Sequence, residues 1–95
     1  MQKHDRAAAF TGSDGLPYSV GLWVDDVPDD RGRYGAALLF VRWSAGGDRP
    51  VGHVETECLA WGGTAAEAET RVKALSLYDV KAALDEAIRA QGDRE

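Results

Sequence analysis

YGAALLFVRW, residues 34–43, is an almost uninterrupted run of apolar and aromatic residues. A strand with one buried face alternates apolar and polar side chains, whereas this run predicts a strand that is covered on both faces. Turn-forming sequence bounds it, with Pro28 and Gly32 on one side and Gly46-Gly47 on the other. We therefore expect the rest of the chain to be arranged around this central strand.

The segments on either side of the central run have the period-two pattern of strands with one buried face. Residues 18–26 alternate apolar residues with mostly small or polar ones, and residues 51–61 place His53, Glu55 and Glu57 on one face. Because the three predicted strands are consecutive and their connections are short, the sequence predicts an antiparallel meander.

The C-terminal third of the chain is rich in helix-forming residues, and it follows the helix-breaking pair Gly62-Gly63. Thr64-x-x-Glu67 fits a capping box at a helix N-terminus. On one straight helix the apolar residues would form two stripes on opposite sides, which favours a break near Ser76. We expect either two helices, at about 64–75 and 77–91, or one helix with a kink between these ranges.

These elements predict a single α+β domain over residues 1–95. A three-stranded antiparallel meander, at about 18–26, 34–43 and 51–61, is followed by helix packed on one face, in a βββα or βββαα order. Residues 1–10 and 91–95 are polar or alanine-rich, and we expect them to be frayed.

The central strand has two apolar faces, and the helices can cover one of them. The simplest assignment places Leu39, Val41, Trp43, Val54 and Cys58 under the helices and Trp23, Leu38, Phe40 and Arg42 on the other face, beside His53. A slip of one residue in the strand register would exchange the two sets.

An exposed apolar surface rimmed by charge is typical of an interface, which leads us to expect a homodimer. Such a dimer would bury either the uncovered sheet face or the outer stripe of the second helix. The candidate interface residues are Trp23, Leu38, Phe40, Arg42, His53, Leu84 and Ile88.

Composition excludes several classes of protein. The net charge is −5, and the 11 basic residues are scattered, which argues against binding to nucleic acid or to an anionic membrane. Cys58 is the only cysteine, so no internal disulfide can form. There is no apolar stretch long enough to span a membrane, and the first residues lack a secretion signal, so we expect a cytoplasmic protein.

Three sets of residues can be considered for chemistry. His53, Glu55 and Glu57 point the same way on one strand and can together hold a metal ion or act as acid and base, although a solvated face is the simpler interpretation. Cys58 is better explained as a small buried residue than as a nucleophile beside His53. The acidic loop formed by Asp25, Asp26, Asp29 and Asp30 lacks the spacing of an EF-hand.

No pattern for a nucleotide or other cofactor is present, and no catalytic Ser-His-Asp set is visible. The three tryptophans, Trp23, Trp43 and Trp61, occupy similar places in their strands and are expected to be core or interface anchors. We therefore expect no cofactor, and we regard an enzyme as the less favoured interpretation.

Two families resemble this arrangement of a sheet followed by a helix, with Pro17-Tyr18 opening the first strand and Gly62-Gly63-Thr64 preceding the helix. One is the double-stranded-RNA-binding domain, but its lysine-rich helix start is replaced here by Thr64-Ala65-Ala66-Glu67, so RNA binding is not implied. The other is the HicB-like antitoxin core, whose helix begins with a similar Thr-x-x-Glu-Ala sequence, matched by Thr64, Glu67 and Ala68. This resemblance implies a dimeric protein-binding module without catalytic residues.

The sequence therefore favours a small non-catalytic binding or assembly module that forms a homodimer. Two alternatives stay open. The first is a metal-binding protein or small enzyme using His53, Glu55 and Glu57, and the second is an antitoxin-like partner of another protein.

Overall fold

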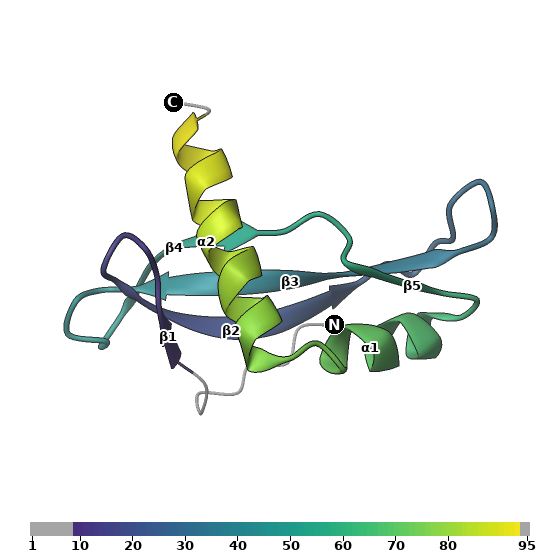
Figure 1. Cartoon of the computed structure of the whole chain (residues 1–95), viewed down its shortest axis with the longest axis horizontal. Coiled ribbons are helices and arrows are strands. Elements are labelled where there is room, and N and C mark those ends of the chain that lie inside the picture. Colours follow the sequence, from purple (N-terminus) through teal and green to yellow (C-terminus); the bar gives the residue numbers. More distant parts are fainter. Residues whose placement is uncertain (1–8, 94–95) are drawn as a thin grey trace.

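The computed structural model describes residues 9–93, which form one antiparallel sheet and two helices (Figure 1). The elements are β1 (Ala9–Thr11), β2 (Pro17–Val24), β3 (Tyr34–Trp43), β4 (Pro50–Glu55), β5 (Ala60–Gly62), α1 (Ala65–Lys73) and α2 (Leu77–Asp93). The predicted α+β order, with the helices after the strands, is confirmed.

β3 lies inside the sheet, as the apolar run predicts. The strand order is β1-β2-β3-β4, and β5 pairs with the beginning of β3 on the same side as β4. Tyr18 faces Arg42 and Val20 faces Phe40 across β2 and β3, while Phe40 faces Val54 across β3 and β4.

The predicted single strand over residues 51–61 is wrong, because the structure divides it into β4 and β5. The interruption begins at Thr56, whose hydroxyl oxygen accepts a hydrogen bond from the Leu38 N–H at 3.0 Å and donates one to the Glu57 carbonyl at 2.7 Å. A side chain has thus taken a place that a main-chain carbonyl holds in a regular ladder.

The prediction of frayed ends stays a prediction, and the described residues at both ends take part in regular elements. Ala9 and Phe10 belong to β1, which pairs with the first residues of β2, and residues 91–93 belong to α2. Residues 1–8 and 94–95, which were included in that prediction, lie outside the described part of the chain.

Both helices begin where the sequence signals place them. The Thr64 hydroxyl accepts from the Glu67 N–H at 3.1 Å and caps α1. Ser76 and Asp79 cap α2 reciprocally, with the Asp79 N–H donating to the Ser76 hydroxyl at 3.0 Å and the Ser76 N–H donating to the Asp79 carboxylate at 3.3 Å. The chain therefore breaks between two helices. Neither described helix is long and apolar enough to cross a membrane.

A single core lies between the sheet and the two helices. It contains Tyr18, Ala36, Leu38, Phe40 and Val54 from the sheet and Ala68, Val72, Val80, Leu84 and Ala87 from the helices. Residues of both helices belong to this one cluster, which shows that both helices cover the same face of the sheet. We call this the covered face and the opposite one the outer face. Burial of Leu38 and Phe40 stabilises the fold by about 1.5–3 kcal/mol for each side chain.

The predicted face assignment is reversed for the residues of β3, whereas Val54 faces the core and Trp23 and His53 face outward as predicted. Leu38 and Phe40 point under the helices, whereas Leu39 and Val41 lie on the outer face with His53. The cause is an irregularity in the β3–β4 register: Trp43 faces Pro50, but Arg42 faces Gly52, so Val51 is an extra residue in β4. A regular pairing from Trp43 would place Leu39 opposite Val54, and the bulge shifts the pattern by one residue.

Candidate functional site

The outer face of the sheet carries apolar side chains from β2, β3 and β5. Trp23 stands next to Ala37, Leu39 next to Gly21, and Val41 next to Ser19 across β2 and β3. Trp43 and Trp61 lie on the same face, because side chains alternate along a strand and Trp61 pairs with Gly35. Trp23 is 55% exposed and Trp61 is 36% exposed.

Polar contacts hold all three indoles of the outer face. The Trp23 Nε1–H donates to an Asp25 carboxylate oxygen at 3.2 Å, and the Trp43 Nε1–H donates to the Ser19 hydroxyl at 3.0 Å. The Arg33 guanidinium lies over the Trp61 ring, 4.7 Å from its centroid, in a cation–π contact. These contacts fix the orientation of the three indole rings within a single chain.

The structure divides the predicted interface residues between the two faces. Trp23 and His53 lie on the outer face and are exposed. Leu38, Phe40 and Leu84 are buried in the core, and Ile88 packs against it, so the expectation that these four side chains form an exposed patch is wrong. Leu38 and Phe40 lie on the face of β3 that both helices cover, and the bulge at Val51 aligns Val54 of β4 with that face.

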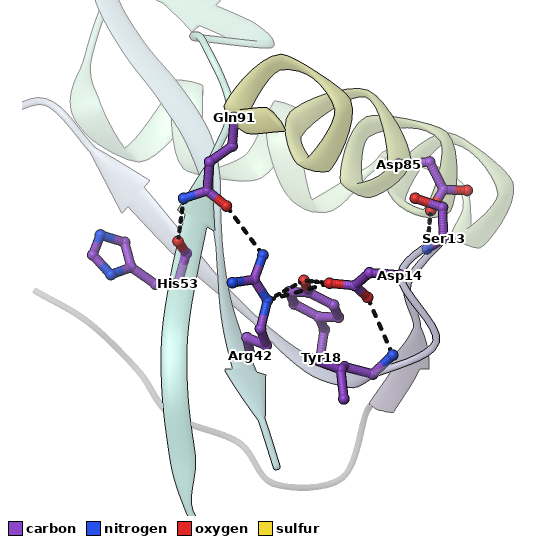
Figure 2. Close-up of polar contacts among 8 residues, drawn as sticks. Ser13, Asp14, Tyr18, Arg42, His53, Asp85 and Gln91 are labelled. Carbon is purple, nitrogen blue, oxygen red and sulfur yellow. Dashed lines mark hydrogen bonds and ion pairs between the residues drawn. The ribbon is translucent and has the colours of Figure 1, made fainter. Parts of the chain in front are cut away.

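Arg42, the other predicted interface residue, also points to the covered side. Figure 2 shows it at the end of the core in a polar network with Tyr18, Asp14 and Gln91. The Arg42 Nε–H donates to the Tyr18 hydroxyl oxygen at 2.6 Å, and that hydroxyl donates to an Asp14 carboxylate oxygen at 2.6 Å. Arg42 Nε is also 3.3 Å from Asp14 Oδ2, which completes a triangle around a fully buried tyrosine.

The same network ties α2 to the sheet at two points (Figure 2). Arg42 Nη2 donates to Gln91 Oε1 at 3.0 Å, and Gln91 Nε2 donates to the His53 carbonyl at 3.4 Å. Earlier in α2, the Asp85 carboxylate accepts a hydrogen bond from the Ser13 N–H at 3.1 Å and forms an ion pair with Lys81 at 2.7 Å. These contacts hold the turn before β2 and the ends of β3 and β4 against one helix.

The network shifts the pKa values of its members in directions that preserve it. Burial, followed by the Asp14 carboxylate, raises the pKa of Tyr18, which keeps the phenol neutral. Burial alone would raise the pKa of Asp14, but hydrogen bonds from Tyr18 and the Leu16 N–H and the charge of Arg42 lower it below 3.8. No buried side-chain N or O atom among the described residues lacks a hydrogen-bond partner, so the network is a satisfied structural clamp.

The predicted metal-binding set is not assembled. His53 and Glu55 are exposed on β4, and Glu57 lies in the interruption that follows it. Within residues 9–93, no three His, Cys, Asp or Glu side chains come together in a group that can hold a metal ion.

Cys58 lies against the outer side of the sheet, contrary to the predicted inward position. A Cβ atom at Gly35 would be 2.6 Å from the Cys58 sulfur, which shows how closely the thiol covers that glycine. Burial and the nearby Asp25 carboxylate raise the pKa of the thiol. His53 pairs with Val41, six residues from Gly35 along β3 or about 20 Å, so the imidazole does not reach the sulfur.

The acidic loop between β2 and β3 uses its carboxylates to fold itself. Asp29 accepts hydrogen bonds from the N–H groups of Arg31 and Arg33, at 2.9 and 2.8 Å, and pairs with the Arg33 side chain. The Arg33 N–H is the main cause of the lowered pKa of Asp29. Asp25 is engaged by Trp23, as described above. These carboxylates therefore have structural partners.

The chain matches no protein-family model, no curated protein and no solved structure. The two family resemblances noted from the sequence therefore rest on their few matching residues.

Sequence reasoning missed the Tyr18 network, although one signal for it was present. Arg42 interrupts an apolar run that was predicted to be buried on both sides, and a cation there requires a carboxylate or a dipole as a partner. Asp14, in the turn four residues before Tyr18, is such a partner. The sequence separation of 28 residues between Asp14 and Arg42 hides the pairing from any local pattern.

Proposed function

We propose that this protein is a non-catalytic assembly module that forms a homodimer by packing its outer face against the outer face of a second copy. The observation that carries the proposal is Trp23, which is 55% exposed on an apolar sheet face that neither described helix covers. Large exposed apolar surfaces on small proteins are typically interaction sites.

The alternation of large and small side chains on the outer face supports a second copy of the chain as the partner. Large side chains lie next to small ones across β2 and β3, as Trp23 does next to Ala37 and Leu39 next to Gly21. Such a surface has ridges and hollows of similar size, so a two-fold related copy can place its ridges in the hollows, as facing sheets do in a sandwich. The face is also charge-poor at its centre, with Asp25, Arg33 and Glu55 at its margins.

The size of the molecule is sufficient for such an interface. The two longer dimensions of the chain are 42 and 30 Å, and the sheet extends broadly across this view (Figure 1). A stable interface requires about 800 Å² from each partner, which is a fraction of a surface of those dimensions.

The test is the mass of the protein in solution, by light scattering or sedimentation, from low to high micromolar concentration. Trp23→Ser combined with Leu39→Ser is expected to weaken association by more than about tenfold, because both changes remove apolar contact from the centre of the interface. A concentration-dependent blue shift of tryptophan emission in the wild-type protein gives a second measurement.

Tyr78→Ser combined with Leu77→Ser is the matched control. These residues are as exposed and apolar, at 82% and 75%, but they lie at the start of α2, away from the outer face. The control is expected to associate like the wild type. A wild-type protein that stays monomeric at high micromolar concentration would overturn the proposal.

A further inference from the structure

β4 is an edge strand whose outer main-chain groups face away from the sheet. The Thr56 N–H donates to the Leu38 carbonyl, so even-numbered residues here, including Val54, turn their main-chain groups toward β3. The N–H and C=O groups of His53 and Glu55 then point outward. The contact from Gln91 to the His53 carbonyl agrees with this direction. Such an edge is a template for pairing with another strand.

α2 extends past this edge. Its 17 residues make a helix about 25 Å long, which crosses the sheet and continues beyond β4 at its C-terminal end (Figure 1). A groove lies between this part of the helix and β4. Its walls include Val54 and Glu55 from the strand and Ala83, Ala87 and Ala90 from the helix. Glu86 and Gln91 of the helix line the groove as well, and the three alanines leave room beside β4 for one more strand.

The side chains of β4 complement a second copy of the same strand. In an antiparallel pair centred on Val54, each His53 lies opposite Glu55 of the partner subunit, and this occurs twice by symmetry. Val54 then lies opposite the partner's Val54 under the overhanging helices. Moving the centre to Glu55 would place two carboxylates opposite each other, which is unfavourable.

We propose that β4 pairs with β4 of a second copy in this register, forming one continuous sheet across a two-fold axis perpendicular to it. Gln91 gives up its long contact to the His53 carbonyl, which then accepts from a main-chain N–H of the partner. This interface runs along the edge of β4 and shares the side chains of His53 and Glu55 with the margin of the outer face, and it extends the proposed self-association. The edge axis is perpendicular to the sheet and the outer-face axis is parallel to it, so the two interfaces together produce a closed assembly of four chains where the axes intersect.

A charge exchange tests the register. His53→Glu places two carboxylates opposite each other at both symmetric positions and is expected to weaken edge pairing by about tenfold. Adding Glu55→Lys to the same chain restores opposite charges at both positions and is expected to restore pairing. Ala66→Glu, on the exposed side of α1, is the control for the added negative charge. Circular dichroism checks that each variant is folded.

Solution mass distinguishes this inference from the proposed function. A wild-type assembly of four chains should fall to two with His53→Glu, and also to two with the Trp23→Ser and Leu39→Ser pair. If the wild type is a dimer that His53→Glu dissociates, that the added Glu55→Lys restores and that the outer-face variants leave intact, edge pairing stands and the outer-face proposal fails. If only the outer-face variants dissociate it, the inference is overturned and the proposed function stands.

Amide hydrogen exchange gives a readout that a change of mass alone does not. The N–H groups of His53 and Glu55 point outward in a single chain, so their slow exchange at high protein concentration requires a strand added to β4. Fast exchange of both at concentrations where the protein is associated would overturn the inference, as would a charge exchange that fails to restore association.

Discussion

The two faces of β3 carry side chains of similar hydrophobicity but opposite surroundings. On the covered face, Leu38 and Phe40 are 2% and 0% exposed, whereas Leu39 and Val41 on the outer face are partly exposed. The helices make the difference, because both pack over the face that carries Leu38 and Phe40. In this strand, the face on which a side chain lies decides its burial more than residue type does.

Replacing one leucine on each face tests this comparison most strongly. Leu38→Ala removes a side chain packed in the core between the sheet and the helices, and it is expected to lower the free energy of unfolding by about 2–5 kcal/mol. Leu39→Ala makes the same chemical change one residue later and is expected to cost less than about 1 kcal/mol in the dilute monomer.

Denaturant titration at low micromolar concentration measures both values, since dilution removes any contribution from association. Equal losses of unfolding free energy for Leu38→Ala and Leu39→Ala would show that the two faces of β3 are equally buried, contrary to the structure.

Close packing on the covered side predicts a smaller but still large effect at Gly12. A Cβ atom there would be 2.5 Å from the Tyr18 ring and 2.7 Å from Ile88. Gly12→Ala is therefore expected to destabilise the protein by about 1–3 kcal/mol, because the ring and the helix must move apart.

Gly63→Ala is the control for this glycine, because a Cβ at Gly63 meets nothing within 4 Å and its φ is not positive. Its melting temperature should stay within a few degrees of the wild type. A Gly12→Ala protein as stable as this control would contradict the close approach.

Local signals in the sequence were sufficient for the order of a sheet followed by helices and for the helix starts, but not for β1 or for the division of residues 51–61 into two strands. Thr64 and Ser76 cap their helices through residues three positions away, so the information lies within one turn. The apolar run at residues 34–43 likewise identified a strand that lies inside the sheet.

The face assignment depended on a feature that no local pattern contains. One extra residue, Val51, shifts the alternation of β4 relative to β3, and the turn before it is equally compatible with either register. The same limit applies to the candidate site. The three tryptophans were recognised as anchors, but the face that they share follows from strand pairing.

The Tyr18 clamp makes the stability of the covered side depend on pH. The pKa of Tyr18 is raised above 10.0 in the folded protein, so the stability from its neutral form is present below pH 10 and is lost as pH rises further. The pKa of Asp14 is lowered below 3.8, so its contribution is present above that pH and is lost as pH falls through the folded value.

Tyr18→Phe is expected to cost about 1–2 kcal/mol at neutral pH and to remove the alkaline part of this dependence, since the Arg42 and Asp14 groups lose a shared partner. Asp14→Asn should flatten the acid part. Unfolding curves collected across pH measure both. If the Tyr18→Phe protein still loses as much stability at alkaline pH as the wild type, that loss comes from another titrating group.

The smallest expected effect concerns how α2 is held over the covered face. Ser76→Ala removes the hydroxyl that accepts from the Asp79 N–H, and it is expected to cost about 1 kcal/mol. Ser76→Asp keeps an acceptor at the cap and should recover most of that stability, although the carboxylate of Asp79 lies close by. Thermal unfolding of the two variants separates loss of the cap from any change in the surface of the helix.

Because α2 carries Val80 and Leu84 into the core, the loss should appear as destabilisation of the whole domain, with the helix and the sheet melting in one transition. A helix that melts before the sheet would mean that the covered face is held together by α1 and the strands without α2.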